Sequence, residues 1–142
     1  ALGMGYTYGG HPVSCAVALE TPKIYEERNI LGHVRSVAPH FQGRLAEFGA
    51  SPIVGEARGV GLIGALELVR DKSTRDQYPP EAKAGAQVAA AALAKGLIVR
   101  ALPGDVIGIC PPLIITKAQI DELFDLLTLA VSETENLLMK AA

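Results

Sequence analysis

The sequence predicts a two-layer α+β domain, in which helices pack on one face of a small, mainly antiparallel sheet. Two observations lead to this fold class. Segments with apolar residues every three or four positions, typical of helices, alternate with short segments in which apolar residues recur every second position, as in strands. Along the chain the order is helix, helix, strand, strand, helix, strand, strand, helix. The length of 142 residues fits a single domain with its own core.

The first helix is expected to start at Pro12, because proline is pre-set for the first turn of a helix. Apolar residues from Val13 to Ile24 continue the helical pattern. Pro22 lies in its middle, cannot donate a backbone hydrogen bond, and disfavours helical geometry in the residue before it. We therefore expect a kink or a break at Pro22.

A second helix is expected from about Leu31 to Phe48, with Gly49 as its stop. Pro39 falls inside this segment and is a second position at which a helix can kink. The side chains expected to face the core are spaced three or four residues apart: Val34, Val37, Phe41, Leu45 and Phe48.

Residues 51–70 change to a period of two, which predicts two strands that are split near residues 55–58. Residues 70–81 are charged, contain two adjacent prolines, and are expected to form a solvent-facing loop. An alanine-rich helix over residues 82–95 should follow and end at Gly96.

Residues 97–101 and 106–110 are short β-rich runs separated by a turn composition, which predicts a hairpin. The last helix begins with a capping box, in which Thr116 and Gln119 exchange hydrogen bonds with the first backbone N–H groups. Its apolar stripe comprises Ile120, Leu123, Phe124, Leu127, Ala130, Val131 and Leu138.

Charge and composition limit the partners. The net charge is −2 with both signs interspersed, so neither nucleic acid nor a membrane surface is an expected partner. Hydrophobic residues make up 49%, which suggests surface that something else covers. No apolar run approaches the roughly 18 residues of a membrane span, and the first residues lack the layout of a signal peptide.

Histidines and cysteines form no metal or disulfide pattern. Cys15 and Cys110 are far apart and fit a reducing compartment, so we expect the cytoplasm. His33 and His40 lie seven residues apart without a carboxylate at ligand spacing. We expect no metal site, and we expect both histidines to be solvated or to cap a helix.

Residues 5–12 are the first candidate site. Thr7 offers a hydroxyl, Gly9 and Gly10 allow close backbone approach, and the helix start that follows favours negative charge. The segment could bind an anion, or it could be an ordinary glycine-rich turn before a helix.

Residues 59–64 match the dinucleotide-binding fingerprint, but we interpret the match as accidental. A working fingerprint opens a helix, whereas residues 65–68 alternate like a strand. The glycines would instead permit tight β packing or a bulge.

Arg100 is the second candidate. It ends a short apolar strand beside a turn, where a guanidinium could hold a carboxylate through two parallel hydrogen bonds. An ordinary surface arginine at a strand end is the alternative.

The string from Gly5 to Ala16 resembles the TYSGHP segment of class III pyridoxal-phosphate-dependent ω-aminotransferases. Residues 57–62, 96–101 and 111–116 resemble further landmarks in the family order. The resemblance spans nearly the whole chain but only the C-terminal third of such an enzyme, so the chain looks like a fragment. It implies that residues 1–142 form the small domain of a fold type I aminotransferase, with residues 1–29 as motif and linking helix and residues 30–142 as the α+β body.

The resemblance also implies roles for individual residues. Thr7, helped by the backbone at Tyr6, would hold the phosphate of pyridoxal 5'-phosphate belonging to the neighbouring subunit. Arg100 would bind the substrate carboxylate and swing aside for apolar amines, and Arg58 would be structural, at the domain interface. The lysine that carries the cofactor belongs to the large domain, so we expect no catalytic residue in this chain.

By resemblance, the parent is a dimeric cytoplasmic aminotransferase that moves an amino group between an amine or ω-amino acid and a keto acid such as pyruvate. The large cofactor-binding domain of the same polypeptide would be the partner of this chain. On its own the chain is expected to be inactive and not to retain the cofactor. The rival interpretation is a non-catalytic α+β interaction module that dimerises through apolar helix faces.

Overall fold

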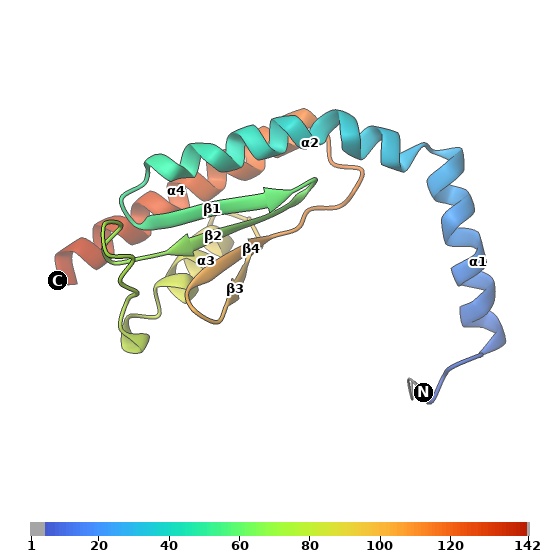
Figure 1. Ribbon diagram of the computed structural model, residues 1–142, viewed down its shortest axis with the longest axis horizontal. Helices are drawn as coiled ribbons and strands as arrows, with labels where there is room; N and C mark the ends of the chain where they lie inside the picture. The colour runs from blue at the N-terminus through green and yellow to red at the C-terminus, as the bar shows by residue number, and fades with distance from the viewer. Residues whose placement is uncertain (1–4, 142) are drawn as a thin grey trace.

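A long helix projects from a two-layer body in the computed structural model, which describes residues 5–141 (Figure 1). The predicted order of elements is confirmed, and so is the α+β fold class. The elements are α1 (Pro12–Glu27), α2 (Ile30–Glu47), the 3₁₀ turn η1 (Phe48–Ala50), β1 (Val54–Val60), β2 (Ile63–Leu68), the 3₁₀ turn η2 (Pro80–Ala82), α3 (Ala84–Ala94), β3 (Arg100–Leu102), β4 (Val106–Ile109) and α4 (Lys117–Ala141).

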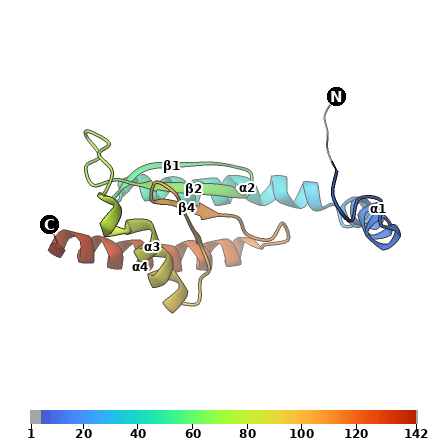
Figure 2. The same ribbon diagram turned by 90° about the horizontal axis from the view of Figure 1, so that it is seen from below.

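The sheet has four strands in the order β1-β2-β4-β3, and every neighbouring pair is antiparallel. Buried side chains of β2 and β4, such as Leu66 and Ile107, meet the apolar stripes of the helices on one face of the sheet. Figure 2 shows α3 and α4 together on one side of it. The strands β1 and β3 form the two edges.

Aromatic side chains hold α2 against α4. Phe124 is fully buried, and its ring centre lies 5.0 Å from that of Phe41 in an edge-to-face arrangement. The ring of Phe48 lies 6.0 Å away. These rings come from the core positions that the helical spacing predicts, and burying such area is the main favourable term in folding.

Of the kink or break expected at Pro22, the break does not occur, because α1 continues through Pro22 to Glu27. No residue of α1 is buried. Water can therefore satisfy the carbonyl of Ala18, which loses its helical partner at Pro22. The chain turns instead at Asn29, which adopts a φ of +47°. The helix α2 likewise continues through the exposed Pro39.

The predicted split near residues 55–58 is also wrong. The two strands separate at Gly61 and Leu62, and Val60 pairs with Ile63 across this two-residue turn. Gly61 has a φ of +58°, a conformation that glycine adopts without a steric cost and that tight hairpin turns need. At residues 55–58 the structure has a shift of register between Val54 and Glu56, inside β1.

Residues 59–64 form this hairpin, not the strand, turn and helix of a dinucleotide site. Gly59 and Gly64 are paired and face α2. A Cβ atom on Gly59 would lie 2.9 Å from Leu45 Cδ2, and one on Gly64 would lie 3.0 Å from the same atom. The tight-packing interpretation of these glycines is confirmed.

Local signals at the helix ends are confirmed. The N–H of Leu97 bonds to the carbonyl of Ala92, and Gly96 has a φ of +86°, which together form a Schellman-type end to α3. Thr116 and Gln119 make the reciprocal hydrogen bonds of a capping box at 3.0 and 3.3 Å. Residues 70–77 are exposed, as expected of the charged loop.

Arg100 begins strand β3; the prediction that it ends a strand is wrong. The pairs with β4 run only from Arg100–Gly108 to Leu102–Val106. In this register Val99 falls opposite Ile109 and Ile98 opposite Cys110, but Leu97 falls opposite Pro111, which has no N–H to donate, so the hairpin cannot extend to Leu97.

Both histidines of α2 take part in tertiary contacts, so the expectation that they are solvated or capping is wrong. His33 Nε2 lies 2.9 Å from the carbonyl oxygen of Ile115, and His40 Nε2 lies 2.8 Å from Asp121 Oδ1. Their partners lie about 80 residues further along the chain, just before α4 and near its start. Within residues 5–141 no helix is long and apolar enough to cross a membrane.

Candidate functional site

The helices leave one face of the sheet open, and strand register fixes which residues lie on it. Arg58 pairs with Ala65, Ala65 with Gly108, and Gly108 with Arg100. These residues form one row across all four strands, with an arginine on each edge strand and two small residues between them. A neighbouring row on the same face contains Glu56, Glu67, Val106 and Leu102. We call these two rows the open face.

Arg100 is exposed, and within residues 5–141 its guanidinium makes no side-chain hydrogen bond or ion pair. Its neighbours in the two rows are uncharged: Gly108 opposite, and Leu102 and Val106 in the next row. A Cβ atom on Gly108 would lie 3.2 Å from Leu102 Cδ1, so this side chain lies over the glycine. An unpaired guanidinium beside apolar groups is well placed to bind a carboxylate ligand.

Arg58 differs from Arg100 in its surroundings. Its Nη1 atom donates to Glu67 Oε2 at 2.8 Å and lies 3.3 Å from Glu56 Oε2. The three side chains are partly exposed, with Glu67 the least at 29%. Two carboxylates therefore compensate the charge of Arg58 and hold its side chain in place.

The segment before α1 forms a tight turn. The N–H of Gly9 bonds to the carbonyl of Tyr6 at 2.9 Å, and Gly10 has a φ of +76°. Thr7 and Tyr6 are both exposed, the latter by 78%. In the described part of the chain the hydroxyl of Thr7 has no hydrogen-bond partner.

Some backbone N–H groups at the start of α1 make no hydrogen bond within the described residues. The first N–H that bonds back within the helix is that of Cys15, which reaches the carbonyl of His11. His11 provides no side-chain cap. The N–H groups of Val13 and Ser14 therefore remain available next to the turn, where the helix dipole favours an anion. A threonine hydroxyl and free helix-start N–H groups fit one side of a phosphate group.

A single chain does not bring the two candidate sites together. The start of α1 lies away from β3 in Figure 1, and Figure 2 likewise shows α1 apart from the labelled strands of the sheet. The turn that carries Thr7 and the open face that carries Arg100 are thus separate parts of this molecule.

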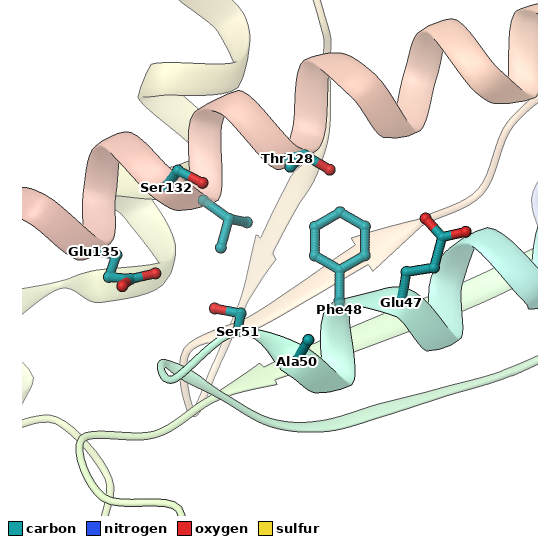
Figure 3. A pocket seen from close by; sticks show the side chains of 8 residues that line it. Glu47, Phe48, Ala50, Ser51, Thr128, Ser132 and Glu135 are labelled. Carbon is teal, nitrogen blue, oxygen red and sulfur yellow. The ribbon is translucent and has the colours of Figure 1, made fainter.

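Sequence reasoning missed a hollow of about 320 Å³ between the end of α2 and α4. Figure 3 shows Glu47, Ser51, Thr128, Ser132 and Glu135 around it. The Oγ atom of Ser51 is buried and has no hydrogen-bond partner among the described residues. The spacing of residues 128, 132 and 135 on one helix face is the signal that could have pointed to it. None of the predicted site residues lines this hollow.

Sequence reasoning also missed a charged network between α2 and α4. Arg44 donates to Asp121 at 2.6 Å and to Asp125 at 2.7 Å. The hydrogen bond to Asp125 is the main factor that raises the pKa of Arg44. The hydrogen bond from Arg44, followed by that from His40, lowers the pKa of Asp121. This network supports the scaffold, and no group of side chains suited to a metal ion occurs within residues 5–141.

Comparison with known proteins gives one consistent answer. The family model described as aminotransferase class-III matches residues 1–131. Gamma aminobutyrate transaminase 1, mitochondrial, from Solanum lycopersicum is 47% identical over 131 residues, which are 92% of this chain and 25% of that protein. Gamma aminobutyrate transaminase 3, chloroplastic, from the same plant is 48% identical over 132 residues, 93% of this chain and 25% of that protein.

Solved structures agree with this result. A transaminase from work on directed evolution by ancestral reconstruction has a TM-score of 0.89 at 44% identity, and the match covers 96% of this chain and 30% of that one. An omega-transferase from Vibrio fluvialis JS17 has a TM-score of 0.89 at 36% identity, with coverage of 99% and 33%. The chain therefore spans about a quarter of the length of these curated relatives, and a third or less of these solved chains.

Proposed function

The chain belongs to the class-III aminotransferase family, and on that premise we propose that it forms the C-terminal small domain of an enzyme that uses pyridoxal phosphate. The reaction would transfer an amino group between an amine or ω-amino acid and a keto acid such as pyruvate. The γ-aminobutyrate transaminases among the relatives support an ω-amino acid as donor. The partner of this domain would be the large domain of the same polypeptide.

The observation that carries this proposal is the state of Arg100. It is exposed, unpaired within the described residues, and has uncharged neighbours on the open face. Two parallel hydrogen bonds from its guanidinium would fix the carboxylate of the keto acid or of the ω-amino acid. With no internal partner to lose, the side chain could also move aside for an amine that has no carboxylate.

The cofactor would be held partly by the turn before α1. Thr7, the backbone near Tyr6 and the free N–H groups at the start of α1 would hold its phosphate. When bound, pyridoxal phosphate supplies the electron sink of the reaction, and the protein supplies orientation and charge placement. Because the turn and Arg100 lie apart in one chain, their distribution supports a homodimer in which Thr7 serves the site of the neighbouring subunit.

The 142-residue chain alone should fold but neither retain the cofactor nor catalyse transamination. Its share of the phosphate site is one helix start and one hydroxyl, too little to offset the cost of association. It should self-associate, because α1 exposes Val13 by 66%, Val17 by 62% and Leu19 by 71%. The same exposure favours, for the isolated chain, the second candidate function of a non-catalytic interaction module.

Two assays test these proposals. The full-length enzyme that contains this chain is incubated with γ-aminobutyrate and pyruvate, and alanine formation is measured; no transfer from any of a panel of amines and ω-amino acids would refute the proposed reaction. The isolated chain is mixed with pyridoxal phosphate, reduced with borohydride and mapped by mass spectrometry. One stoichiometrically modified lysine, together with turnover, would show that the chain is a compact enzyme instead.

For the location of the enzyme we propose the cytoplasm. The support is that Cys15 and Cys110 are both free thiols, which fits a reducing compartment. The plant relatives are named as mitochondrial or chloroplastic proteins, so fractionation of cells followed by immunoblotting would decide between these compartments.

A further inference from the structure

We propose that Glu56, Arg58 and Glu67 act as a charge screen that restricts the carboxylate site at Arg100 to substrates with a single carboxylate. This inference rests on the proposed function of Arg100 and adds the class of keto acid that the open face accepts. It assigns to Glu67 a role in substrate specificity in addition to its ion pair with Arg58.

The register of the strands provides the geometry. Arg58 and Arg100 occupy the same row, with Ala65 and Gly108 between them. Strands in a sheet lie about 4.8 Å apart, so the Cα atoms of the two arginines are about 14 Å apart. The two small residues leave room above the row, and a ligand carboxylate bound to Arg100 can have the rest of the ligand extend along it.

The charges on the two sides of this row are unequal. On the β3 and β4 side, Arg100 has only uncharged neighbours in the two rows, among them Leu102 and Val106. On the β1 and β2 side, Arg58 is paired with both Glu56 and Glu67. One cation and two carboxylates leave a net charge of −1 there, so Arg58 cannot serve as a free second anchor.

A second carboxylate on the ligand would therefore meet repulsion. If the first carboxylate is bound by Arg100, a second one that extends along the row approaches Glu67 on β2 and an arginine already occupied by acids. A keto acid whose other end is short and apolar lies over Ala65 and Gly108 instead, and no like charge weakens its binding. The open face should thus favour pyruvate over a dicarboxylic keto acid such as 2-oxoglutarate.

The test uses Glu67→Gln in the full-length enzyme, assayed with pyruvate and with 2-oxoglutarate as acceptors. The ratio of kcat/KM for 2-oxoglutarate to that for pyruvate should rise about tenfold, the order expected when one like charge is removed from a partly exposed site. Glu133→Gln is the matched control: it removes the same charge and breaks an ion pair, with Lys95, on the helix side. In that variant the ratio should stay within twofold of the wild-type value.

The triple variant Glu56→Gln, Arg58→Ala and Glu67→Gln separates two sources of the gain, because its net charge there is zero, as in Glu67→Gln, but it has no arginine. A triple variant that loses the increase shows that Arg58 binds the second carboxylate once Glu67 is neutralised. One that keeps the increase shows that the loss of repulsion suffices, and either result supports the screen. An unchanged ratio in Glu67→Gln, with transamination intact, would overturn the screen while leaving the proposed function standing.

A binding measurement on the 142-residue chain is independent of catalysis. Butyrate and glutarate are titrated separately, and the arginine Nε–H signals are followed by NMR. In the wild type, butyrate should shift the Arg100 signal at lower concentration than glutarate does, and Glu67→Gln should reverse or abolish this order. If the full-length enzyme shows no transamination, the proposed reaction fails, but this titration still tests the charge screen. The same order of butyrate and glutarate in the wild type and in Glu67→Gln would refute the charge screen.

Discussion

Replacement of Arg100 by alanine in the full-length enzyme should damage acceptor turnover without harming the fold. Within the described residues Arg100 has no internal partner to leave unpaired, and it sits on an edge strand with its side chain exposed. Its removal should change the free energy of unfolding by less than about 0.5 kcal/mol, as an ordinary surface substitution does.

The catalytic effect should be much larger. Loss of a charged bidentate partner that is desolvated by the bound substrate costs on the order of 2–5 kcal/mol. At about 1.4 kcal/mol per factor of ten, kcat/KM for pyruvate should fall by roughly 30-fold to several thousand-fold. Turnover of an apolar amine donor should fall far less, because no carboxylate of that substrate needs Arg100.

Steady-state kinetics with a fixed co-substrate checks this difference. The control is Arg35→Ala, an exposed arginine on α2 away from the sheet, which removes the same charge. It should leave both half-reactions within about twofold of the wild-type rates. Equal losses for the keto acid and for the apolar amine in Arg100→Ala would refute the role of Arg100 in carboxylate binding.

Three further predictions concern the phosphate turn, the core and the charged network. Thr7→Val in the full-length enzyme should lower cofactor content after dialysis while leaving the circular dichroism spectrum intact, because a methyl replaces the hydroxyl donor; unchanged retention would make Thr7 only a turn residue. Phe124→Ala should cost about 3–5 kcal/mol in urea unfolding, since the ring is fully buried against Phe41 and Phe48, whereas Leu129→Ala, 57% exposed on the same helix, should cost below about 1 kcal/mol. Asp121 has a lowered pKa, chiefly from the hydrogen bond with Arg44, so its contribution to stability is present above the unfolded-state value of about 3.9 and is lost as the pH falls through the folded-state pKa. The difference in urea midpoint between wild type and Asp121→Asn should therefore shrink below about pH 4; a difference that stays constant down to pH 2 would contradict it.

The parts of the fold that sequence predicts well are those set by neighbours along the chain. The capping box of Thr116 and Gln119 and the glycine end of α3 depend on residues within one turn, so their chemistry can be read locally. The apolar stripe of α4 follows from its 3.6-residue period and was assigned correctly.

The predictions that were wrong depend on surroundings that local sequence does not contain. Both Gly55 and Gly61 could have divided the hairpin, and the pairing of Val60 with Ile63 decided in favour of Gly61. Pro22 leaves its helix intact because water reaches that turn. The contacts of His40 and Arg44 with Asp121 join residues 77 or more positions apart, so no local pattern announces them.

The candidate site combines both kinds of information. Local composition and family resemblance point to Arg100 and Thr7, and their roles stay predictions. What sequence could not supply is the neighbourhood of Arg100, which depends on the strand order β1-β2-β4-β3. That order puts β4, whose open-face residues are Val106 and Gly108, beside β3, and it places the acids of β1 and β2 on the other side.

The two arginines of the open face also have a simpler explanation, but it does not account for the difference in their ion pairs. Charged residues on edge strands protect a sheet from adding further strands, and both Arg58 on β1 and Arg100 on β3 are edge residues. Edge protection accounts for their position, but it requires no difference in their surroundings. Arg58 is nevertheless held by Glu56 and Glu67, while Arg100 is left among apolar groups. Within residues 5–141 the guanidinium of Arg100 forms no ion pair that could stabilise the fold. This contrast is why Arg100, and not Arg58, is the residue to test for ligand binding.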